Sequence, residues 1–280
     1  MLGGYRASYG IMLAGRVLFG LGGESMTVAQ STIVSLWFKG KELNFAMGLN
    51  LSVSRLGSVA NGWVVPPVWS AAGLGAALLV GAALCGASTV AALGLAALDK
   101  RAEQLNPNGA KAALSDDDRF QCADLRRFRL PFWLLVASCL VTYMSVFPYV
   151  QTASGLLQEK YHFSADEAAR LFGIPWFISA GLCPFLGLGI DKVGRRCVFI
   201  IGSSLILIAA FTTSLLLPAC PGTESCYYEV APLVLCGIGY SVYASVIWGS
   251  IPYVVEPRTV GTAYGICTAV QNAGLAYAPW

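Results

Sequence analysis

Four long stretches of this sequence contain no charged residue at all: 71–98, 130–158, 197–223 and 259–280. A helix needs about 20 mostly apolar residues to cross the hydrocarbon core of a bilayer, so each stretch is long enough to span a membrane. Only 12% of the residues are charged, compared with about 25% in soluble domains. The alternating segments of about 10 residues that are typical of transmembrane β-barrels are absent from the sequence. The pattern therefore predicts an all-α polytopic membrane protein.

The spacing of the apolar segments predicts eight membrane spans. We expect them at about 10–38, 42–65, 71–98, 130–152, 165–190, 197–217, 231–255 and 259 to the end. The residues SADE at 164–167 form a capping box, which predicts that the fifth span begins there. No basic segment precedes the first span, so we expect no cleaved signal peptide. The last span reaches Trp280 without a polar flank, so we expect a truncated chain.

The distribution of Lys and Arg predicts the orientation of the spans. Most of the 18 basic residues fall on one side of the membrane, in the loop 39–41, the segment 99–129, the turn 192–196 and at Arg258. Because cytosolic loops are enriched in Lys and Arg, we assign this side to the cytosol. The net charge of +3 is thus a signal of topology, and we find no patch for nucleic acid.

Two cysteines differ from the others, which mostly lie inside predicted spans. Cys220 and Cys226 flank a short loop, CPGTESC, on the side that we assign to the non-cytosolic compartment. A disulfide between them is compatible with an oxidising lumen. The sequence has one histidine, His162, and no CxxC pair, so we expect no metal site and no cofactor.

An internal repeat appears, without a gap, when the sequence is aligned with itself. VLFGLG at 17–22 aligns with VLCGIG at 234–239, and identical residues continue on the next helix. Those later identities are Ala46 with Ala263, Gly48 with Gly265, Val53 with Val270, and Gly57 with Gly274. The two copies are six predicted spans apart, so both would cross the membrane in the same direction, as in transporters built from parallel repeats.

The repeat predicts two six-helix halves joined by a cytosolic linker, with helices 4 to 11 of twelve in this chain. Residues 1–98 would hold helices 4–6 of the N-terminal bundle, 99–129 the linker, and 130–280 helices 7–11 of the C-terminal bundle. The linker is the only long polar segment of the chain.

The turn GLGIDKVGRR at 187–196 has the form G-x-x-x-D-[KR]-x-G-[RK]-[RK]. Gly187 would allow two helices to approach closely, and Gly194 would permit the tight turn. Asp191 could accept hydrogen bonds from N–H groups at a helix start, or from an arginine. We expect these three residues, together with Arg195 and, on the first span, Arg16, to act in conformational gating. For the turn, a merely basic cytosolic loop is the alternative.

This turn, the two-bundle plan and R-x-x-x-G-x-G at 16–22 resemble the major facilitator superfamily. Further segments are similar to its lysosomal dipeptide transporter branch, and the likeness runs from about residue 15 to the end. These segments are GESMTVAQ (23–30), WFKGKELN (37–44), SVSRLGS (52–58), GTAYG (261–265) and QNAGLA (271–276). Compared with that family, we expect the first three helices and the twelfth to be missing from this sequence, and the loop CPGTESC is a further departure.

The resemblance implies a secondary transporter that works by alternating access. It implies a uniporter that carries dipeptides, with cationic side chains favoured, from the lysosome to the cytosol. It also implies an accessory subunit, glycosylated lysosomal membrane protein, that protects the transporter. The only sequon, at Asn50–Ser52, lies inside a predicted span, so the chain offers no usable glycan site of its own.

Two opposite charges are predicted at one depth in the membrane. Glu24 precedes Phe38 by the same distance along the sequence as Arg55 follows Lys41, and a short loop joins the two spans. At 1.5 Å per residue both are about 21 Å from that loop. Buried charges usually have a partner and face a cavity. They are either a structural ion pair or the two poles of a site for a zwitterion, and the resemblance implies the second.

Aromatic residues of the C-terminal half could complete this substrate site. Tyr143, Tyr240 and Trp248 are the candidates, although ordinary helix packing would also explain each of them. Arg16 lies about two helical turns from Glu24 on the non-cytosolic side, where it could line the entry path. Snorkelling of Arg16 to the membrane interface is equally compatible with the sequence.

Other functions have less support in the sequence. An intramembrane enzyme would need a serine nucleophile with a base, paired aspartates or a metal motif such as H-E-x-x-H. The sequence contains no H-E-x-x-H, and Glu24 is the only acid that lies inside a predicted span away from a helix end. A carrier of organic anions, sugars or drugs would keep the same fold, but Glu24 at the depth of Arg55 argues against an anion site. Proton coupling through Glu24 and a transport-inactive fragment both stay open.

Overall fold

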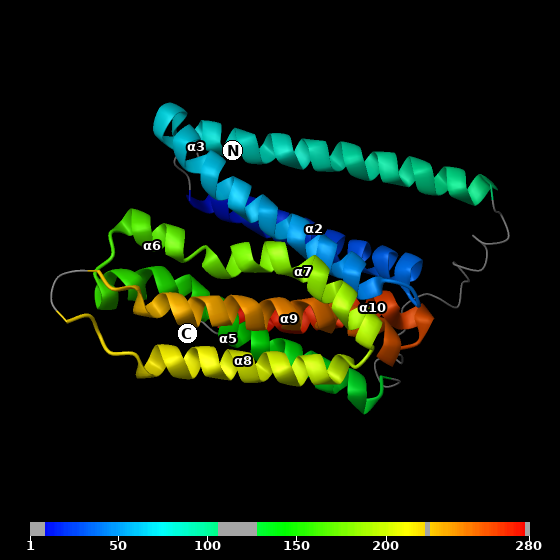
Figure 1. Ribbon diagram of the computed structural model, residues 1–280. Helices are drawn as coiled ribbons and strands as arrows, with labels where there is room; N and C mark the ends of the chain where they lie inside the picture. Colours follow the sequence, from blue (N-terminus) through cyan, green and yellow to red (C-terminus); the bar gives the residue numbers. More distant parts are fainter. Residues whose placement is uncertain (1–8, 106–127, 222–224, 278–280) are drawn as a thin grey trace. The chain divides into compact units, whose positions relative to one another are not determined.

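The computed structural model describes residues 9–105, 128–221 and 225–277, and these residues form helices and connecting turns without any strand (Figure 1). The all-α fold is therefore confirmed for the described part of the chain. The helices are α2 (Tyr9–Phe38), α3 (Leu43–Leu105), α5 (Leu130–Tyr161), α6 (Ala165–Leu171), α7 (Ile174–Val193), α8 (Arg196–Leu216), α9 (Val230–Val254) and α10 (Val260–Tyr277). Short 3-10 helices, η3 (Tyr227–Glu229) and η4 (Pro257–Thr259), precede α9 and α10.

The chain divides into two compact units. Unit 1 comprises Met1–Glu24 and Ala60–Asp124, and unit 2 comprises Ser25–Val59 and Leu125–Trp280. The boundary falls within α2 and again within α3. The division into residues 1–98, 99–129 and 130–280 stays a prediction. Helix α3 continues to Leu105, so the first residues of the expected linker are helical, and residues 106–127 lie outside the described part.

Helix α3 covers two of the predicted spans. The sequence predicts a break between residues 65 and 71, but the helical backbone is interrupted at Gly73, with φ 76° and ψ 177°. A positive φ favours glycine, which has no Cβ to clash with the backbone. The break therefore lies at Gly73, a glycine that tolerates this conformation, and not at the two prolines before Gly73.

Unit 2 is organised around α9, which packs against both α7 and α8, while α10 packs against α5. Buried residues occur on all sides of α9, from Pro232 to Pro252. A helix that is apolar all round is expected in the interior of a bundle. The large side chains Tyr240, Tyr243 and Ile247 are fully buried in this core.

Six helical segments of the described residues are long and apolar enough to cross a membrane. They are Tyr9–Phe38, Pro67–Leu98, Leu130–Tyr161, Glu167–Val193, Arg196–Leu216 and Tyr227–Val254. The first part of α3 and the helix α10 are predicted spans that do not reach this apolarity. Both form helices at the predicted positions, and their polar residues, such as Asn50, Arg55 and Gln271, lower the hydropathy.

The ends of two helices carry the local features that the sequence predicts. Ser164 and Glu167 form the capping box at the start of α6, with the Glu167 N–H donating to Ser164 Oγ (3.3 Å) and the Ser164 N–H donating to Glu167 Oε2 (3.2 Å). Cys220 and Cys226 are joined in a disulfide. The Cys220 N–H also donates to the Lys160 carbonyl oxygen at the end of α5 (3.3 Å).

Candidate functional site

Arg55 lies on the part of α3 that belongs to unit 2, and its guanidinium group is surrounded by aromatic side chains. The side chain donates a hydrogen bond from Nη2 to the hydroxyl oxygen of Tyr240 on α9. The guanidinium carbon lies 4.5 Å from the ring centre of Trp176, 5.3 Å from that of Tyr240 and 5.8 Å from that of Phe147. A guanidinium within about 6 Å of a ring centre is attracted by the ring quadrupole. The arginine is thus held by rings of α5, α7 and α9.

Of the three aromatic residues predicted for the site, Tyr143 contacts both of the others. The ring centre of Tyr143 is 6.0 Å from that of Tyr240 and 6.3 Å from that of Trp248. The Trp248 indole N–H donates to the Tyr143 hydroxyl oxygen at 3.0 Å. Trp248 also stacks on Tyr264, whose hydroxyl group donates to the Trp248 carbonyl oxygen at 2.9 Å. These contacts form a continuous aromatic network that begins at Arg55.

Glu24 and Arg16 lie on the part of α2 that belongs to unit 1. Both side chains are exposed. Arg55 belongs to unit 2, so the pairing of Glu24 with Arg55 stays a prediction, as does the place of Arg16 on an entry path.

Asp191, in the last turn of α7, caps the start of α3. Its Oδ2 accepts the Phe45 N–H at 2.9 Å, and its Oδ1 accepts the Asn44 N–H at 3.3 Å and the Asn44 side-chain amide at 2.6 Å. The first N–H groups of a helix have no carbonyl partner within that helix, and a carboxylate there is favoured by the helix dipole. Arg196 Nη2 lies 3.9 Å from Oδ1. The carboxylate therefore makes both kinds of contact that the motif predicts.

Glycines bring the first turns of α3 close to α7 and α9. A Cβ added at Gly187 of α7 would overlap the carbonyl oxygen of Asn44, and one at Gly249 of α9 would overlap the Asn44 side chain. A Cβ at Gly48 would lie 2.5 Å from the Cys183 carbonyl oxygen. The prediction that Gly187 permits a close helix approach is confirmed. Gly48 extends this contact of backbone with backbone along the start of α3, and Gly249 leaves room for the Asn44 side chain.

The turn after α7 follows the motif in part. Gly194 has φ 72°, the left-handed conformation that ends a helix most easily at glycine. Arg195 is exposed, whereas the guanidinium carbon of Arg196 lies 3.9 Å from the ring centre of Tyr253 near the end of α9. The Gly40 N–H in the loop between α2 and α3 donates to the Tyr253 hydroxyl oxygen at 3.4 Å. Arg196 is therefore the arginine of this motif that packs in the described structure.

The family model of the Major Facilitator Superfamily matches residues 1–279. The chain belongs to this superfamily. It is 35% identical over 286 residues to the lysosomal dipeptide transporter MFSD1 of Bos taurus, covering 98% of this chain and 58% of that protein. The match to the same transporter of Gallus gallus is 35% over 285 residues, covering 98% and 62%. That of Danio rerio matches at 35% over 277 residues, covering 95% and 58%.

Membership of the Major Facilitator Superfamily makes the chain a multi-pass integral membrane protein of a transporter family, and not of an enzyme family. The chain spans about three-fifths of the length of these curated relatives. In the described residues, no group of three or more His, Cys, Asp or Glu side chains could hold a metal ion.

Two of the rings around Arg55 are not apparent from the sequence. Phe147 and Trp176 lie in apolar stretches where neither spacing nor charge distinguishes them from core residues. Only the approach of α5 and α7 to α3 reveals that they face a cation. The motif contains both Arg195 and Arg196, and the sequence does not show which of two adjacent arginines in a turn faces inward. The prediction names Arg195, whereas Arg196 is the one that packs.

Glu229 is a further buried acid that lies outside the predicted spans. It ends η3 and is fully buried. Its carboxylate accepts hydrogen bonds from the hydroxyl groups of Tyr149 (2.7 Å), Tyr161 (3.1 Å) and Ser214. The donors come from α5 and α8, so Glu229 joins both helices to the start of α9. Glu229 is not predicted from the sequence, because this residue lies just before the expected span at 231–255.

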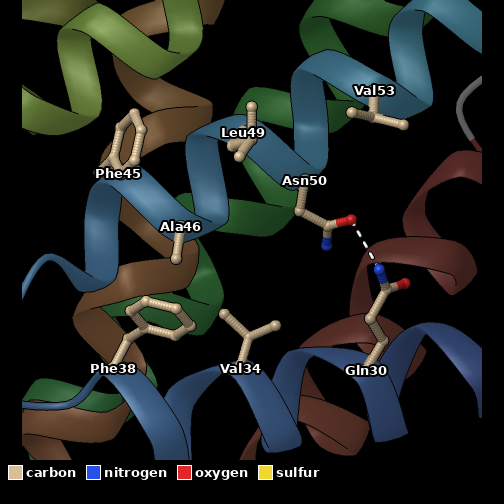
Figure 2. Close-up of a pocket in the computed structure, with 8 residues that line it drawn as sticks. All are labelled: Gln30, Val34, Phe38, Phe45, Ala46, Leu49, Asn50 and Val53. Atoms are coloured by element: carbon tan, nitrogen blue, oxygen red, sulfur yellow. Dashed lines mark hydrogen bonds between the residues drawn. The ribbon is translucent and has the colours of Figure 1, made fainter. Parts of the chain in front are cut away.

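A shallow groove runs between α2 and α3 within unit 2 (Figure 2). Apolar side chains form most of its wall, with one polar pair at the end: the Gln30 side-chain amide donates to Asn50 Oδ1 at 2.7 Å. Figure 2 shows this hydrogen bond joining the two helices. Asn50, the residue of the only sequon, therefore lies within a helix and is hydrogen-bonded, which agrees with the prediction that it is no usable glycan site.

Proposed function

We propose that this protein is a secondary transporter that carries dipeptides from the lysosome to the cytosol by alternating access. The name of its relatives, lysosomal dipeptide transporter, supports the substrate class and the compartment. Cationic side chains are favoured in this proposal, transport is uniport, and glycosylated lysosomal membrane protein serves as an accessory subunit. The Cys220–Cys226 disulfide supports the orientation, since it lies on the side opposite to most basic loops.

Arg55 is the observation that carries the proposal. A guanidinium group has five N–H donors, and that of Arg55 makes a hydrogen bond to Tyr240, while its buried Nε has no hydrogen-bond partner. Buried polar groups are nearly always hydrogen-bonded in a purely structural role. Arg55 is thus a partly buried charged group with unused hydrogen-bond donors, in a protein of a transporter superfamily. Such a group is suited to bind the carboxylate of a substrate through two hydrogen bonds.

Glu24 supplies the opposite pole in this proposal. Its carboxylate would bind the substrate ammonium while Arg55 binds the substrate carboxylate, so that both termini of a dipeptide are recognised. In the empty protein Glu24 would pair with Arg55 while the Arg55 guanidinium keeps its ring contacts, and this pairing would lower the cost of keeping each charge inside the membrane. Tyr143, Tyr240 and Trp248 would border the substrate between these poles.

The contact between the start of α3 and helices α7 and α9 acts as the gate on the cytosolic side. Asp191 and Gly187 hold this contact, and Gly194 and Arg195 form the turn that would move with it. Release of substrate to the cytosol requires the contact to open, because backbone packed on backbone leaves no room for a peptide. Arg16 would line the entry path on the opposite side.

The test measures uptake of radiolabelled lysyl-alanine by proteoliposomes that contain the whole protein, with free lysine and glucose as comparison solutes. We expect saturable uptake of the dipeptide that both Glu24→Gln and Arg55→Lys reduce by more than about 10-fold. Glu24→Gln removes the negative charge that binds the ammonium, and Arg55→Lys replaces the bidentate guanidinium by an ammonium that cannot fork the carboxylate. Glu256→Gln, at an exposed acid outside the site, is the matched control and should leave uptake unchanged. Equal uptake by wild type and both site variants would refute the two-pole site.

The same assay separates the remaining alternatives. An imposed pH gradient should not change the accumulated dipeptide if transport is uniport. Competition by an organic anion as strong as that by the dipeptide, with no effect of Glu24→Gln, would instead indicate an anion carrier. The accessory subunit is tested by the half-life of the transporter in lysosomes with and without the partner, which should shorten without it.

A further inference from the structure

The rings around Arg55 form a cage whose members also contact one another. The ring centres of Phe147 and Trp176 are 5.3 Å apart, those of Trp176 and Tyr240 are 5.6 Å apart, and those of Phe147 and Tyr240 are 6.0 Å apart. Tyr143 stacks on Phe147 from outside, with ring centres 5.3 Å apart. Each of α5, α7 and α9 supplies one ring. The cage is therefore held by aromatic contacts that do not involve the arginine.

The cage has the chemistry of a site for an organic cation. Ring faces attract a guanidinium or ammonium group by about 0.5–2 kcal/mol, and more strongly where water is excluded. The cation that fills it belongs to α3 and makes a hydrogen bond to Tyr240. The cage residues themselves carry no charge, so nothing in the cage distinguishes Arg55 from another cation of similar size.

Arg55 has a better partner available when a substrate carboxylate arrives. A charged, bidentate guanidinium–carboxylate pair is stronger than a contact with a ring face. If Arg55 turns to the carboxylate, the three rings lose their cation, and the contact energy is lost with it. A substrate that carries its own cationic side chain restores that energy, while a neutral side chain does not.

We propose that Phe147, Trp176 and Tyr240 form a cation subsite that Arg55 fills in the empty protein and that an ammonium or guanidinium side chain of the substrate fills after Arg55 has turned to the substrate carboxylate. Trp176, the ring nearest to the guanidinium carbon, is then a specificity-determining residue. This proposal rests on the proposed dipeptide transport and names the residues that select the side chain.

The test compares two dipeptides that share both termini: lysyl-alanine, with a side-chain ammonium, and norleucyl-alanine, without one. Their dissociation constants are measured by calorimetry on the whole protein, for wild type and for Trp176→Leu. We expect wild type to bind lysyl-alanine about fivefold more tightly, which corresponds to a cation–ring contact of about 1 kcal/mol. In Trp176→Leu this preference should fall to about onefold, because norleucyl-alanine binding no longer loses a cation–ring contact and should become about fivefold tighter, while lysyl-alanine binds as in wild type.

Three further variants sharpen the result. Trp176→Phe keeps a ring and should retain part of the preference, whereas Phe147→Leu should reduce it even if Trp176→Leu does not fold. Trp133→Leu removes a ring of the same size from α5, in contact with Phe128 and Phe132 and not with Arg55, and should leave the preference intact.

The outcomes separate the two proposals. If both dipeptides bind and the preference survives in Trp176→Leu and Phe147→Leu, the cation subsite is refuted and dipeptide binding stands. If wild type binds neither dipeptide, the proposed function fails, and the cation subsite fails with it.

Discussion

The two copies of the internal repeat have the same pattern of glycines but different surroundings. The first copy lies on α2 and the start of α3, and the second lies on α9 and α10. Most residues of α9 between Pro232 and Pro252 are buried, whereas in α2 only Ser31 and Ser35 are buried among the described residues. A repeated sequence pattern thus specifies two similar helical hairpins, but the surroundings decide how deeply each is buried.

The glycines show this difference at single positions. A Cβ added at Gly237 of α9 would lie 2.9 Å from the Cα of Pro175, and one at Gly239 would lie 3.0 Å from Leu207. In the part of the chain that the structure describes, no atom lies within 4 Å of such a Cβ at their counterparts Gly20 and Gly22. Within the described residues, Gly237 and Gly239 of the second copy therefore serve a tight helix contact, and Gly20 and Gly22 of the first copy do not.

The charged residues inside the predicted spans of the repeat are found in the first copy, whereas the tight contacts of Gly237 and Gly239 are found in the second. Glu24 and Arg55 occur in the first copy, and the aligned positions of the second copy are Ser241 and Asn272. Ser241 is fully buried, and its hydroxyl group donates to the Gly237 carbonyl oxygen of the same helix (2.6 Å). The second copy is thus a packed scaffold, and the first copy carries the ionisable groups that we propose for the substrate.

The largest expected effect tests this division of roles at Arg55 and Asn272. Arg55→Met should lower dipeptide affinity about 100-fold, because losing one partner of a buried charge pair costs about 2–5 kcal/mol. Asn272→Ala, at the aligned position, should change affinity by less than about threefold, as it removes no charge. Calorimetric titration of both variants with lysyl-alanine gives the comparison. Comparable losses in the two variants would show that both copies contribute to binding.

The next effect concerns packing at Gly237 and Gly20. Gly237→Ala should destabilise the protein by about 1–3 kcal/mol, because the added methyl group meets the backbone of Pro175 and α9 must shift away from α7. Gly20→Ala should be neutral or slightly stabilising, since an open helix position favours alanine over glycine. Thermal unfolding of the purified variants measures both. The comparison fails if Gly20→Ala destabilises as much as Gly237→Ala.

The sequence predicts the helices well because apolar length and charge are properties of single segments. It also predicts the capping box at Ser164 and the role of Asp191 at a helix start, since both depend on short local patterns. The cage around Arg55 could not be predicted, because Phe147 and Trp176 acquire their role only when three distant helices meet. The predicted break in α3, between residues 65 and 71, lies a few residues before the observed one at Gly73, because the apolarity of the segments does not show which residue adopts the non-helical conformation.

A smaller effect is expected at the starts of the second helices of the two copies. Helix α3 is capped by Asp191 of a distant helix, so Asp191→Ala should destabilise by about 0.5–2 kcal/mol, the usual cost of losing a cap. Near the start of α10, Glu256 pairs with Arg258 at the surface (3.2 Å), and Glu256→Ala should cost at most about 1 kcal/mol. Unfolding temperatures of the two variants provide the measurement. A larger loss for Glu256→Ala would contradict the assignment of Asp191 as the helix cap.

The smallest expected effect compares alanine substitutions within the second helix of each copy, at Gly57 of α3 and at Gly274 of α10. Gly57 is exposed with no atom near a new Cβ, so Gly57→Ala should stabilise by about 0.5–1 kcal/mol through the higher helix propensity of alanine. At Gly274 the new Cβ would meet the flexible ends of Leu140 and Met144, whose displacement should cancel this gain. The pair is measured by thermal unfolding of the whole protein. If Gly57→Ala instead destabilises by more than Gly274→Ala, the first copy is packed as tightly as the second in the whole protein, and the difference between the copies lies in their charges alone.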